Sequence, residues 1–552
     1  MRDAQPNSAD EDVRVLARGG FRIAPHITGT AFRRAGDATT NAVDPQRRPF
    51  EPEESNSMND MSVAAQSPFL SDPDKVHLIG GKWRPSASGE RIETRNPATG
   101  KVLATLARGR QEDVDLAVAT ARQAFEGPWS RFSPTQRHAL LIKVNDIVEK
   151  NWDELARLET LDMGAPLSRT VKMKDRMRQT ILFFASQTMN CHGETIPNSL
   201  EGNFTTMTLK APVGVVGGII PWNGPLVSQW WVLGGALATG CTVVMKPAED
   251  ASLTTLRMAE LLLEAGVPEG VVNVVTGLGA EAGAALAAHP DVNRVAFTGS
   301  TVTGREIIRA SAVNMKRLSL ELGGKSPDII FADANLDKAV PGAAMGVFSN
   351  SGQICYAGTR VFVQRSIQEE FVERFSAFGK GLMVGDPLDP KVHLGPLVSQ
   401  RQLDRVLGYV ASGNKEGAKL VSGGSRLGGD LASGYFVEPT VFSDVNNTMT
   451  IAREEIFGPV VSVIPFNDAD EALRLANDTD YGLGGAVWTT NVSTMNRMMH
   501  GIKAGQVWVN CYGVVDLAVG FGGYKHSGYG WKGGSQHVDG FLYQKAVTIN
   551  GD

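Results

Sequence analysis

VGVVGGIIP, at residues 213–221, opens the part of the sequence that decides the fold. It is the first of four short apolar runs, and each of them precedes a segment rich in Gly, Ala or Leu. Strands that alternate with helices in this order predict a doubly wound α/β sheet. A second alternating block runs from Ser326 to about Trp488. The predicted strands are VGVVGGIIP, TVVMKP (242–247), VVNVVTG (271–277) and RVAFTGS (294–300) in the first block, and DIIFAD (328–333), RVFVQ (360–364) and VSVIPF (461–466) in the second.

The segments on either side of these blocks have other patterns. From Gln111 to about Asn190, apolar residues recur at i, i+3 and i+4, which predicts amphipathic helices. Residues 203–212 and 542–550 have strand-like composition with polar residues interleaved, so they predict a small β-unit or an ordinary hairpin. The first residues mix Arg with Asp and Glu without sustained periodicity, and we expect a disordered extension over residues 1–72. Neither a secretory signal nor a transit peptide is expected there.

The composition of the chain excludes several classes of function. With 552 residues, 42% of them hydrophobic and 20% charged, it is typical of a globular protein of two or three domains. A formal net charge of −5 gives no reason to expect nucleic acid or an anionic membrane as a partner. No apolar run reaches the ~18–20 residues that a membrane span needs. The four scattered cysteines predict neither a disulfide framework nor a metal site, and they fit a reducing, cytoplasmic location.

The segment SGQICYAGTR presents Cys355 among small residues, which is typical of a nucleophilic thiol. A cysteine attacks a carbonyl carbon as a thiolate, so it needs a base that takes its proton or activates a later water. Glu321, in LELGGKSP, lies 34 residues upstream, and two glycines near it allow the backbone to pack closely. A lone Cys is more often buried packing and a lone Glu a solvated charge, so the prediction depends on finding both together. We predict Cys355 as the nucleophile and Glu321 as the base.

On these motifs the chain resembles the NAD(P)-dependent aldehyde dehydrogenase superfamily, from about Val76 to the C-terminus. The resemblance implies an aldehyde-dehydrogenase-like α/β fold and NAD-dependent oxidation of an aldehyde to the carboxylic acid. It also implies a homodimer or homotetramer, in which strands of a small β-extension pair between subunits. The implied units are a Rossmann-type cofactor domain (73–192 and 213–323), an α/β catalytic domain (324–540) and the oligomerisation β-extension (193–212 and 541–552).

The resemblance gives Asn223, in PWNGP, the role of an oxyanion donor. Its side-chain N–H would act with the backbone N–H of Cys355, and aimed donors of this kind are typically worth ~3–4 kcal/mol. Thiolate attack would give a thiohemiacetal, hydride would pass to NAD, and the thioester would be hydrolysed with Glu321 as general base. Two alternatives remain open: a CoA-acylating semialdehyde dehydrogenase, and a catalytically silent scaffold on the same fold. The acylating branch generally lacks the Glu that Glu321 supplies, and a scaffold is expected to lose its nucleophile or base.

Four motifs match the family's dinucleotide site. GLGAEAG (277–283) has one residue too many for GxGxxG, so by pattern alone a tight turn is an equal alternative. FTGSTVTG (297–304) predicts a strand end and a helix N-terminus that can receive a pyrophosphate. In KPAED, a carboxylate at Glu249 can bind ribose hydroxyls but repels a 2′-phosphate, which favours NAD and leaves NADP possible. The fourth motif is EEIFGPV, at the nicotinamide end. The resemblance assigns to the cofactor Trp222, Lys246, Glu249, Gly279, Gly299, Ser300, Leu322, Glu455 and Phe457.

The predicted substrate pocket departs from family members that oxidise small aliphatic aldehydes. Gly224 and Ser349 stand where such members carry aromatic residues, and Ser228 stands where a Met is frequent. Val515 replaces a common Phe. Loss of large side chains opens space, so we expect a bulky aldehyde, aromatic or terpenoid-like. The remaining aromatic walls are predicted at Trp231, Tyr356 and Phe521.

The C-terminal motif is only partly like the family's. FGGYKHSGYG (521–530) matches, but Gly520 replaces a usual Pro, and WKGGSQHVDGF (531–541) replaces a common Arg-Glu-Leu-Gly run. We therefore expect an altered local conformation near the end of the chain.

Overall fold

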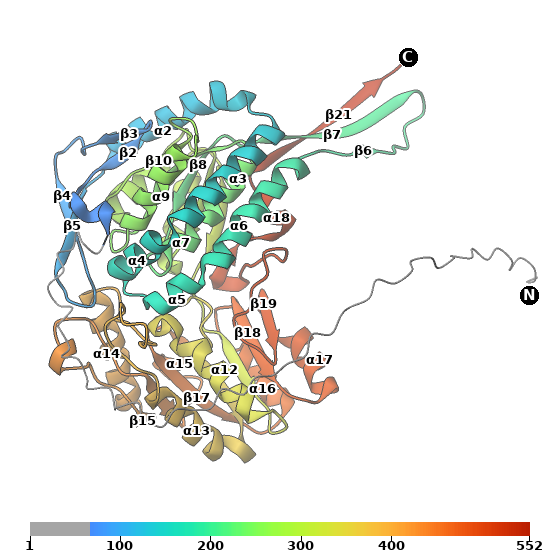
Figure 1. The fold of residues 1–552 in the computed structure, drawn as a ribbon. Helices are drawn as coiled ribbons and strands as arrows, with labels where there is room; N and C mark the ends of the chain where they lie inside the picture. Colours follow the sequence, from blue (N-terminus) through green and yellow to red (C-terminus); the bar gives the residue numbers. More distant parts are fainter. Residues whose placement is uncertain (1–66) are drawn as a thin grey trace, which may run out of the picture. The chain divides into compact units, whose positions relative to one another are not determined.

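The computed structural model describes residues 67–552, and the strands predicted between residues 213 and 300 form the centre of an eight-stranded sheet (Figure 1). Its order is β20-β12-β11-β8-β9-β10-β2-β3. Neighbours from β12 to β10 run parallel and the outer pairs are antiparallel, so the four predicted strands are confirmed. The strands are β2 (His77–Ile79), β3 (Lys82–Arg84), β8 (Val215–Ile219), β9 (Thr242–Lys246), β10 (Val272–Val274), β11 (Arg294–Thr298), β12 (Arg317–Glu321) and β20 (Gly528–Tyr529).

Helices cover both faces of this sheet. The adjacent, fully buried residues Val215 and Val216 belong to different apolar clusters, because successive side chains of a strand point to opposite faces. One face packs against α3, α4, α6, α8 and α9, and the other against α2, α10 and α11, which is the predicted doubly wound arrangement. The helices are α2 (Gln111–Glu126), α3 (Pro134–Lys150), α4 (Trp152–Met163), α6 (Lys174–Gln187), α8 (Trp230–Thr239), α9 (Leu253–Glu264), α10 (Ala284–Ala288) and α11 (Thr301–Ser311).

The second alternating block forms a seven-stranded sheet of order β15-β16-β17-β14-β13-β18-β19. Its neighbours are parallel except β15 and β16, and Ile329 and Ile330 pack into clusters on its two faces. The strands are β13 (Pro327–Ile330), β14 (Arg360–Gln364), β15 (Lys419–Ser422), β16 (Thr440–Ser443), β17 (Val460–Phe466), β18 (Gly484–Trp488) and β19 (Gln506–Val509). Its covering helices are α12 (Leu336–Phe348), α13 (Gln368–Lys380), α14 (Gln400–Lys415), α16 (Ala469–Asn477) and α17 (Val492–Gly501).

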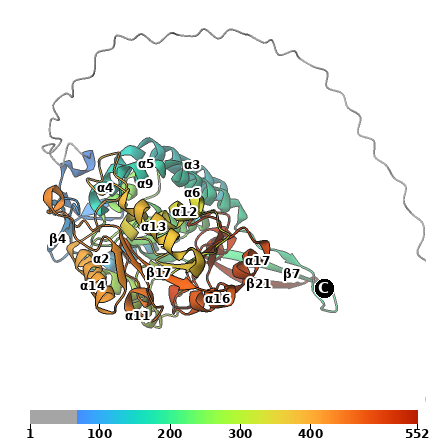
Figure 2. The same cartoon turned by 90° about the horizontal axis from the view of Figure 1, so that it is seen from below.

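A three-stranded sheet forms an arm that projects from the two large sheets in both views (Figures 1 and 2). It has the order β21-β7-β6, and β21 pairs antiparallel with β7 from Leu542 opposite Pro212 to Asn550 opposite Phe204. The two strand-like segments of the sequence are therefore paired with each other. The strands are β6 (Thr195–Ile196), β7 (Phe204–Pro212) and β21 (Leu542–Asn550); a separate small sheet contains β1 (Asp74–Lys75), β4 (Arg91–Arg95) and β5 (Val102–Ala107).

Two predicted boundaries need correction. Residues 1–66 of the predicted extension lie outside the described residues, but Pro68–Ser71 form a short 3₁₀ helix whose Leu70 is buried in the apolar core. Residues of the predicted catalytic domain also return to the first sheet: β20 pairs with β12, and α18 (Gly534–Asp539) packs on α8. The reason is that the outer edge of β12 gains backbone hydrogen bonds from β20.

Within residues 67–552, no helix is long and apolar enough to cross a membrane. The same residues contain no group of three or more His, Cys, Asp or Glu side chains arranged to hold a metal ion.

Candidate active site

Cys355 follows a short strained segment that connects α12 to β14. Asn350 and Ser351 have φ of 54° and 55°, a region that costs free energy for residues other than Gly, and Gly352 has a φ of 73°. Their surroundings hold this conformation. The Asn350 side-chain amide donates to the carbonyl oxygen of Asn223 at 3.0 Å, and the Ser351 hydroxyl donates to a carbonyl of a neighbouring loop at 2.7 Å. The turn fixes the direction in which the next residues, including Cys355, leave α12.

Asn223 lies against this segment. Its Nδ2 donates to the carbonyl oxygen of Gln353 at 2.9 Å. The Gln353 side chain is itself held, because its Oε1 accepts from Val398 N at 2.9 Å and its Nε2 donates to Asn350 O at 3.1 Å. A primary amide has two N–H groups, and this bond uses one of them. The structure thus brings the Asn223 side chain to the backbone two residues before Cys355.

Glu321 is the last residue of β12, and the glycines that follow make close approach possible. A β-carbon on Gly324 would collide with the carbonyl oxygen of Cys355, and one on Gly323 would collide with the Glu455 carboxylate. Gly324 N donates to Glu455 Oε1 at 3.0 Å. The close backbone packing expected of LELGGKSP is therefore present, and it joins Glu321, Cys355 and Glu455 in one site.

The carboxyl group of Glu321 is buried, and neither of its oxygens has a hydrogen-bond partner among the described residues. Burial raises its pKa above the usual value, while the charge of Lys532 lowers it. The pKa of the Cys355 thiol is raised by burial and then by the carboxylates of Glu321 and Glu455. These effects favour the protonated thiol over the thiolate. A carboxylate with a raised pKa is a stronger base than an exposed one.

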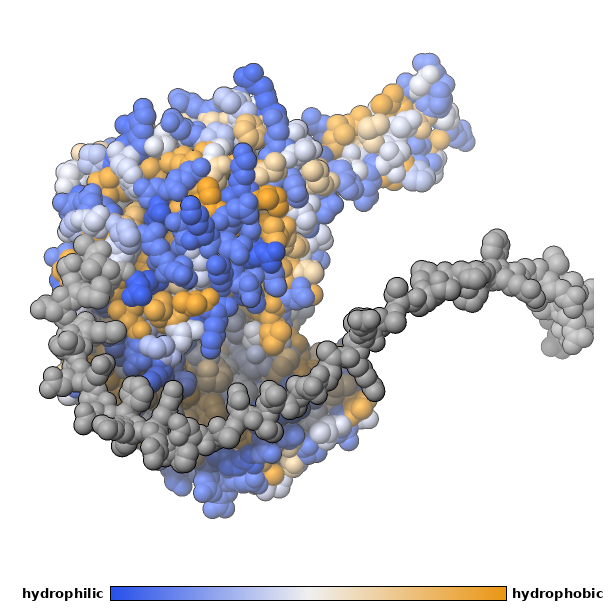
Figure 3. Space-filling model, viewed as in Figure 1, coloured by the Kyte–Doolittle hydropathy of each residue, from blue (hydrophilic) through white to orange (hydrophobic). Residues whose placement is uncertain are grey.

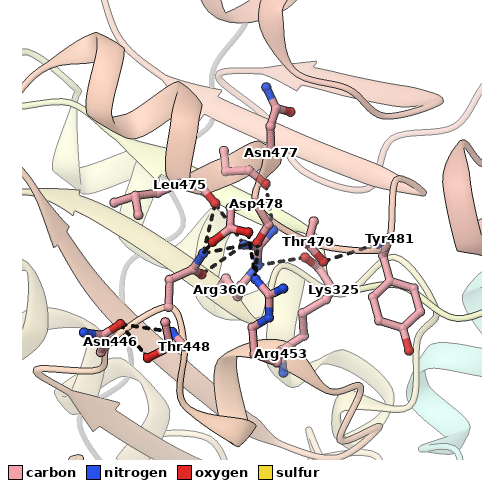
Figure 4. Close-up of polar contacts among 12 residues, drawn as sticks. Lys325, Arg360, Asn446, Thr448, Arg453, Leu475, Asn477, Asp478, Thr479 and Tyr481 are labelled. Carbon is pink, nitrogen blue, oxygen red and sulfur yellow. Dashed lines mark hydrogen bonds and ion pairs between the residues drawn. The ribbon is translucent and has the colours of Figure 1, made fainter.

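Arg360, at the start of β14, anchors the chain that follows Cys355, and Figure 4 shows its polar contacts. Its guanidinium is fully buried, and Nε donates to the carbonyl oxygen of Lys325 at 3.0 Å, which links the segments after Cys355 and Glu321. It also donates to the side chain of Asn447 at 3.1 Å and to two of the last carbonyls of α16 at 3.1 and 2.8 Å. Carbonyls at a helix C-terminus lack intrahelical partners and favour a cation. The role of Arg360 is therefore structural.

A second cluster lies at the end of β9. Lys246 Nζ donates to Glu249 Oε2 and to the carbonyl oxygen of Gly277, both at 3.2 Å. Burial lowers the pKa of Lys246. Burial opposes the ionisation of Glu249, but the charge and hydrogen bond of Lys246 hold its pKa below the usual value. A β-carbon on Gly279 would lie 3.9 Å from both Lys246 Nζ and Glu249 Oε2. The Gly-rich turn thus lies against a donor and an acceptor that fit the hydroxyls of a ribose.

The two glycine motifs take different local forms. Gly279–Gly283 form a single π-helical turn before α10, whereas Ser300 caps the N-terminus of α11 and accepts from Thr303 N at 3.2 Å. Gly299 N donates to Glu321 O at 3.0 Å, which ties the end of β11 to β12. Leu322 is buried against α11. The first turn of α11 lies at the carboxyl end of a parallel sheet, where free N–H groups fit a pyrophosphate.

Glu455 and Phe457 complete the site from the second sheet. The Phe457 ring meets the Trp222 ring edge to face, with centroids 5.2 Å apart and planes at 88°. Phe457 has a φ of 61°, and its carbonyl oxygen accepts from Gln402 Nε2 at 2.8 Å. Burial raises the pKa of Glu455 to about 7, against the lowering effects of its bond from Gly324 and of the charge of Lys325. The two aromatic rings join the two halves of the molecule at this site.

The sequence profile of the Aldehyde dehydrogenase family matches residues 83–547. The chain belongs to the aldehyde dehydrogenase family. It is 46% identical over 484 residues to the putative aldehyde dehydrogenase DhaS of Bacillus subtilis, with 87% of this chain and 97% of that protein covered. It is 45% identical over 539 residues to a mitochondrial benzaldehyde dehydrogenase of Antirrhinum majus, with 97% and 96% covered. The NAD+ complex of an aldehyde dehydrogenase from Bacillus cereus matches with a TM-score of 0.85 and 45% identity, covering 88% of this chain and 98% of that chain.

The enzyme is therefore an oxidoreductase that acts on aldehydes with NAD. The residues described above fit this cofactor, because the Lys246 and Glu249 pair lies beside Gly279 and the first turn of α11 lies at the same sheet edge. When bound, NAD supplies an acceptor for the aldehyde hydride.

The predicted substrate pocket of this aldehyde dehydrogenase is partly open. A β-carbon on Gly224 would have no heavy atom within 4 Å. Ser349 ends α12, Ser228 ends α7 (Pro225–Ser228), and both are half-buried. Aromatic rings gather around the residue after Cys355: the Tyr356 ring lies 5.7 Å from that of Phe521 and 5.6 Å from that of Trp508. The further predicted wall residues are placed as follows: Trp231 packs against His537, and the carbonyl oxygen of Val515 accepts from Arg176.

Three residues of the enzyme's site were not predicted as such. Trp508 lies in VWVNCYG, where its aromatic ring at the end of a strand was a usable signal. Gln353 is two residues before Cys355, and its role as the acceptor for Asn223 depends on backbone geometry. Lys532 lies far from Glu321 in sequence, and only the pairing of β20 with β12 brings its segment close.

Proposed function

We propose that Cys355 is the nucleophile and that Asn223 stabilises the oxyanion. The observation that carries this proposal is the hydrogen bond from Asn223 Nδ2 to Gln353 O, because it aims the amide at the segment of Cys355 before any substrate binds. As the Cys355 sulfur bonds to the aldehyde carbon, the carbonyl oxygen gains negative charge. The free N–H of Asn223 and the backbone N–H of Cys355 then donate to that oxygen.

We further propose that Glu321 is the general base. Its buried carboxylate takes the thiol proton directly or through a water, and Cys355 then forms a thiohemiacetal. After the hydride has left, the acyl group remains on Cys355 as a thioester. Glu321 passes the thiol proton to solvent before hydrolysis, and it then removes a proton from the water that attacks this thioester. The hydroxide oxygen bonds to the acyl carbon as the bond to the Cys355 sulfur breaks, the sulfur takes the proton back from Glu321, and the carboxylic acid is released. The raised pKa of Glu321 supports this role, since a poised base works best near the working pH.

We propose a bulky substrate, aromatic or terpenoid-like. The open space at Gly224 and the small side chains of Ser228 and Ser349 support this choice. The Tyr356, Trp508 and Phe521 rings offer apolar surface to a flat substrate. The benzaldehyde dehydrogenase of Antirrhinum majus, at 45% identity, is named for an aromatic aldehyde.

We propose that the arm assembles the enzyme into homodimers or homotetramers. β21 is an edge strand, and no other strand in residues 67–552 pairs with its outer side. An edge of this kind favours pairing with another chain. Figure 3 shows apolar residues along the arm, and its exposed apolar side chains are Ile196, Leu209, Tyr543 and Ile549. We also propose a cytoplasmic location, supported by four free cysteines and testable by cell fractionation.

NADH formation with a panel of aldehydes tests the substrate and the reaction together. We expect higher kcat/KM for benzaldehyde or a branched C10 aldehyde than for propanal, with the free acid as product. A product that appears only when coenzyme A is added would contradict hydrolysis by Glu321. A preference for propanal would contradict the bulky substrate and leave the roles of Cys355 and Asn223 untouched.

A further inference from the structure

The segment before Lys532 lies directly against the strand that carries Glu321. β20 pairs antiparallel with β12, with Gly528 opposite Glu321. Gly530 has a φ of 100°, and a β-carbon there would lie 2.6 Å from the hydroxyl of Ser319. Ser319 and Glu321 are two residues apart in β12, so they share one face of the strand. The glycines therefore let the chain that leads to Lys532 run closely along β12, from Glu321 towards Ser319.

The backbone of Lys532 is also fixed from the other side. Its N–H donates to the carbonyl oxygen of Phe521, and the Phe521 N–H donates to the Lys532 carbonyl oxygen, both at 2.7 Å. The Phe521 ring packs edge to face on Tyr356, the residue after Cys355. Lys532 is therefore held between the strand of Glu321 and the segment of Cys355.

Lys532 and Glu321 are both buried, each with a side chain that lacks a direct partner. Each residue is 3% exposed, and no ion pair within 4.0 Å joins them or engages either one elsewhere in residues 67–552. A buried charge without a partner is costly, so two opposite buried charges stabilise each other even without direct contact. Accordingly, the charge of Lys532 lowers the pKa of Glu321, and the charge of Glu321 raises that of Lys532 against the larger effect of burial.

The other titratable groups around this pair do not take the place of Lys532. Arg294, from β11, donates to Gly540 O at 2.7 Å and acts on Lys532. His537, from α18, accepts from Gly533 N at 2.8 Å through Nδ1, so its Nε2 donates to Trp231 O and the ring is neutral. Burial, Lys532 and Arg294 hold the pKa of His537 well below its usual value. Burial and the carboxylates of Glu321 and Glu455 raise the pKa of the Cys355 thiol, which favours its neutral form.

We propose that Lys532 is a positioning residue for the general base: its buried ammonium group favours the ionised form of the Glu321 carboxylate, so that Glu321 can accept a proton from the water that hydrolyses the thioester. This inference rests on the proposed role of Glu321. Lys532 itself exchanges no proton in the step. The proton moves from water to the Glu321 carboxylate, the resulting hydroxide oxygen bonds to the acyl carbon, and the bond from that carbon to the Cys355 sulfur breaks.

The test measures thioester hydrolysis directly. The full-length enzyme is acylated on Cys355 with p-nitrophenyl acetate, and the loss of the acetyl mass is followed by intact mass spectrometry between pH 5.5 and 10. For Lys532→Met we expect decay about tenfold slower at pH 7, because a rise of about one unit in an already raised pKa lowers the ionised fraction of Glu321 about tenfold. At high pH the decay should return to the wild-type rate. Lys532→Arg keeps the charge and should keep the wild-type profile.

Lys316→Met is the matched control. Lys316 is also a buried lysine, and it precedes β12 at the end opposite Glu321, where Nζ donates to Ala287 O and His289 O at 2.7 and 2.8 Å. Its loss should lower the melting temperature without moving the pH profile. If Lys532→Met does not fold, Lys532→Gln takes its place.

Two outcomes would overturn the inference. One is a Lys532→Met or Lys532→Gln profile that coincides with wild type. The other is a Lys532→Arg profile displaced as far as that of the neutral variants, because the charge would then not be the cause. Glu321→Gln separates this failure from a failure of the proposed function. If the acetyl group leaves Glu321→Gln as fast as it leaves the wild type, Glu321 is not the base. If it leaves Glu321→Gln slowly at every pH, the role of Glu321 stands, and the Lys532 variants alone decide the role of Lys532.

Discussion

The Asn223 side chain donates a 2.9 Å hydrogen bond to the carbonyl oxygen of Gln353, two residues before Cys355. A second hydrogen bond joins the same two segments, because the Asn350 side chain donates to the Asn223 carbonyl oxygen at 3.0 Å. The two bonds join the loop after β8 to the strained segment that leads to Cys355. A donor fixed in advance stabilises developing charge without reorganisation at the moment of reaction.

Asn223→Ala should lower kcat by about 10²–10³, equivalent to about 2.7–4 kcal/mol, because the variant removes one oxyanion donor. Binding of NAD, measured by calorimetry, should stay close to wild type. Asn190→Ala, at an exposed position, is the control and should leave kcat unchanged. A loss of less than threefold in Asn223→Ala would show that the amide is not aimed at the oxyanion.

Cys355→Ala should abolish aldehyde oxidation, because no other thiol can form the covalent intermediate at this position. The half-buried thiol is not a main packing element, so the melting temperature and the Kd for NAD should stay near wild type. The control is Cys191→Ala, which should keep full turnover. Any turnover of Cys355→Ala above a few per cent of wild type would rule out Cys355 as the nucleophile.

Activity should fall as the pH is lowered through the raised pKa of Glu321. Burial raises the pKa of Glu321, and the group acts as a base only when ionised. As the pH falls through this raised pKa, the carboxylate is protonated and kcat/KM is lost; as the pH rises, kcat/KM recovers. Glu321→Gln should lower kcat/KM strongly and remove this limb from the pH profile. If kcat/KM of the variant still falls at the same pH as in wild type, another group is responsible for the loss of activity.

The strands of the first sheet and the family could be predicted from the sequence. Strand periodicity is local, and the small residues around Cys355 form a recognisable motif. The contacts of Gln353 could not be predicted, because they depend on the positive φ values of Asn350 and Ser351, and neither residue type requires such values. The link between Lys532 and Glu321 could not be predicted for a different reason. A long-range pairing of β20 with β12, which crosses the predicted domain boundary, brings the segment of Lys532 to the strand of Glu321.

Glu249→Gln should raise the use of NADP relative to NAD. The Glu249 carboxylate is ionised beside Lys246, and it would repel a 2′-phosphate. Without that charge, Lys246 can pair with the phosphate instead, and we expect the ratio of kcat/KM for NADP over NAD to rise about tenfold, or about 1.4 kcal/mol. Glu112→Gln, at an exposed position on α2, should leave the ratio unchanged. An unchanged ratio in Glu249→Gln would place the ribose away from this carboxylate.

Gly224→Phe should narrow the substrate range. Gly224 has a φ of 172°, an extended conformation open to any residue, and a β-carbon there would have no heavy atom within 4 Å. The new ring would occupy the space that we assign to a bulky aldehyde and would leave room for propanal. A clash at one pocket wall is typically worth ~1–3 kcal/mol, so the ratio of kcat/KM for benzaldehyde over propanal should fall roughly 10- to 200-fold. Propanal turnover could improve, because a closer wall holds its carbonyl near Cys355. Gly408→Phe adds the same ring at an exposed, equally open position of α14 and should leave the ratio as in wild type. If Gly224→Phe also leaves the ratio unchanged, Gly224 does not line the substrate path, and the small side chains at this loop do not explain a preference for bulky aldehydes.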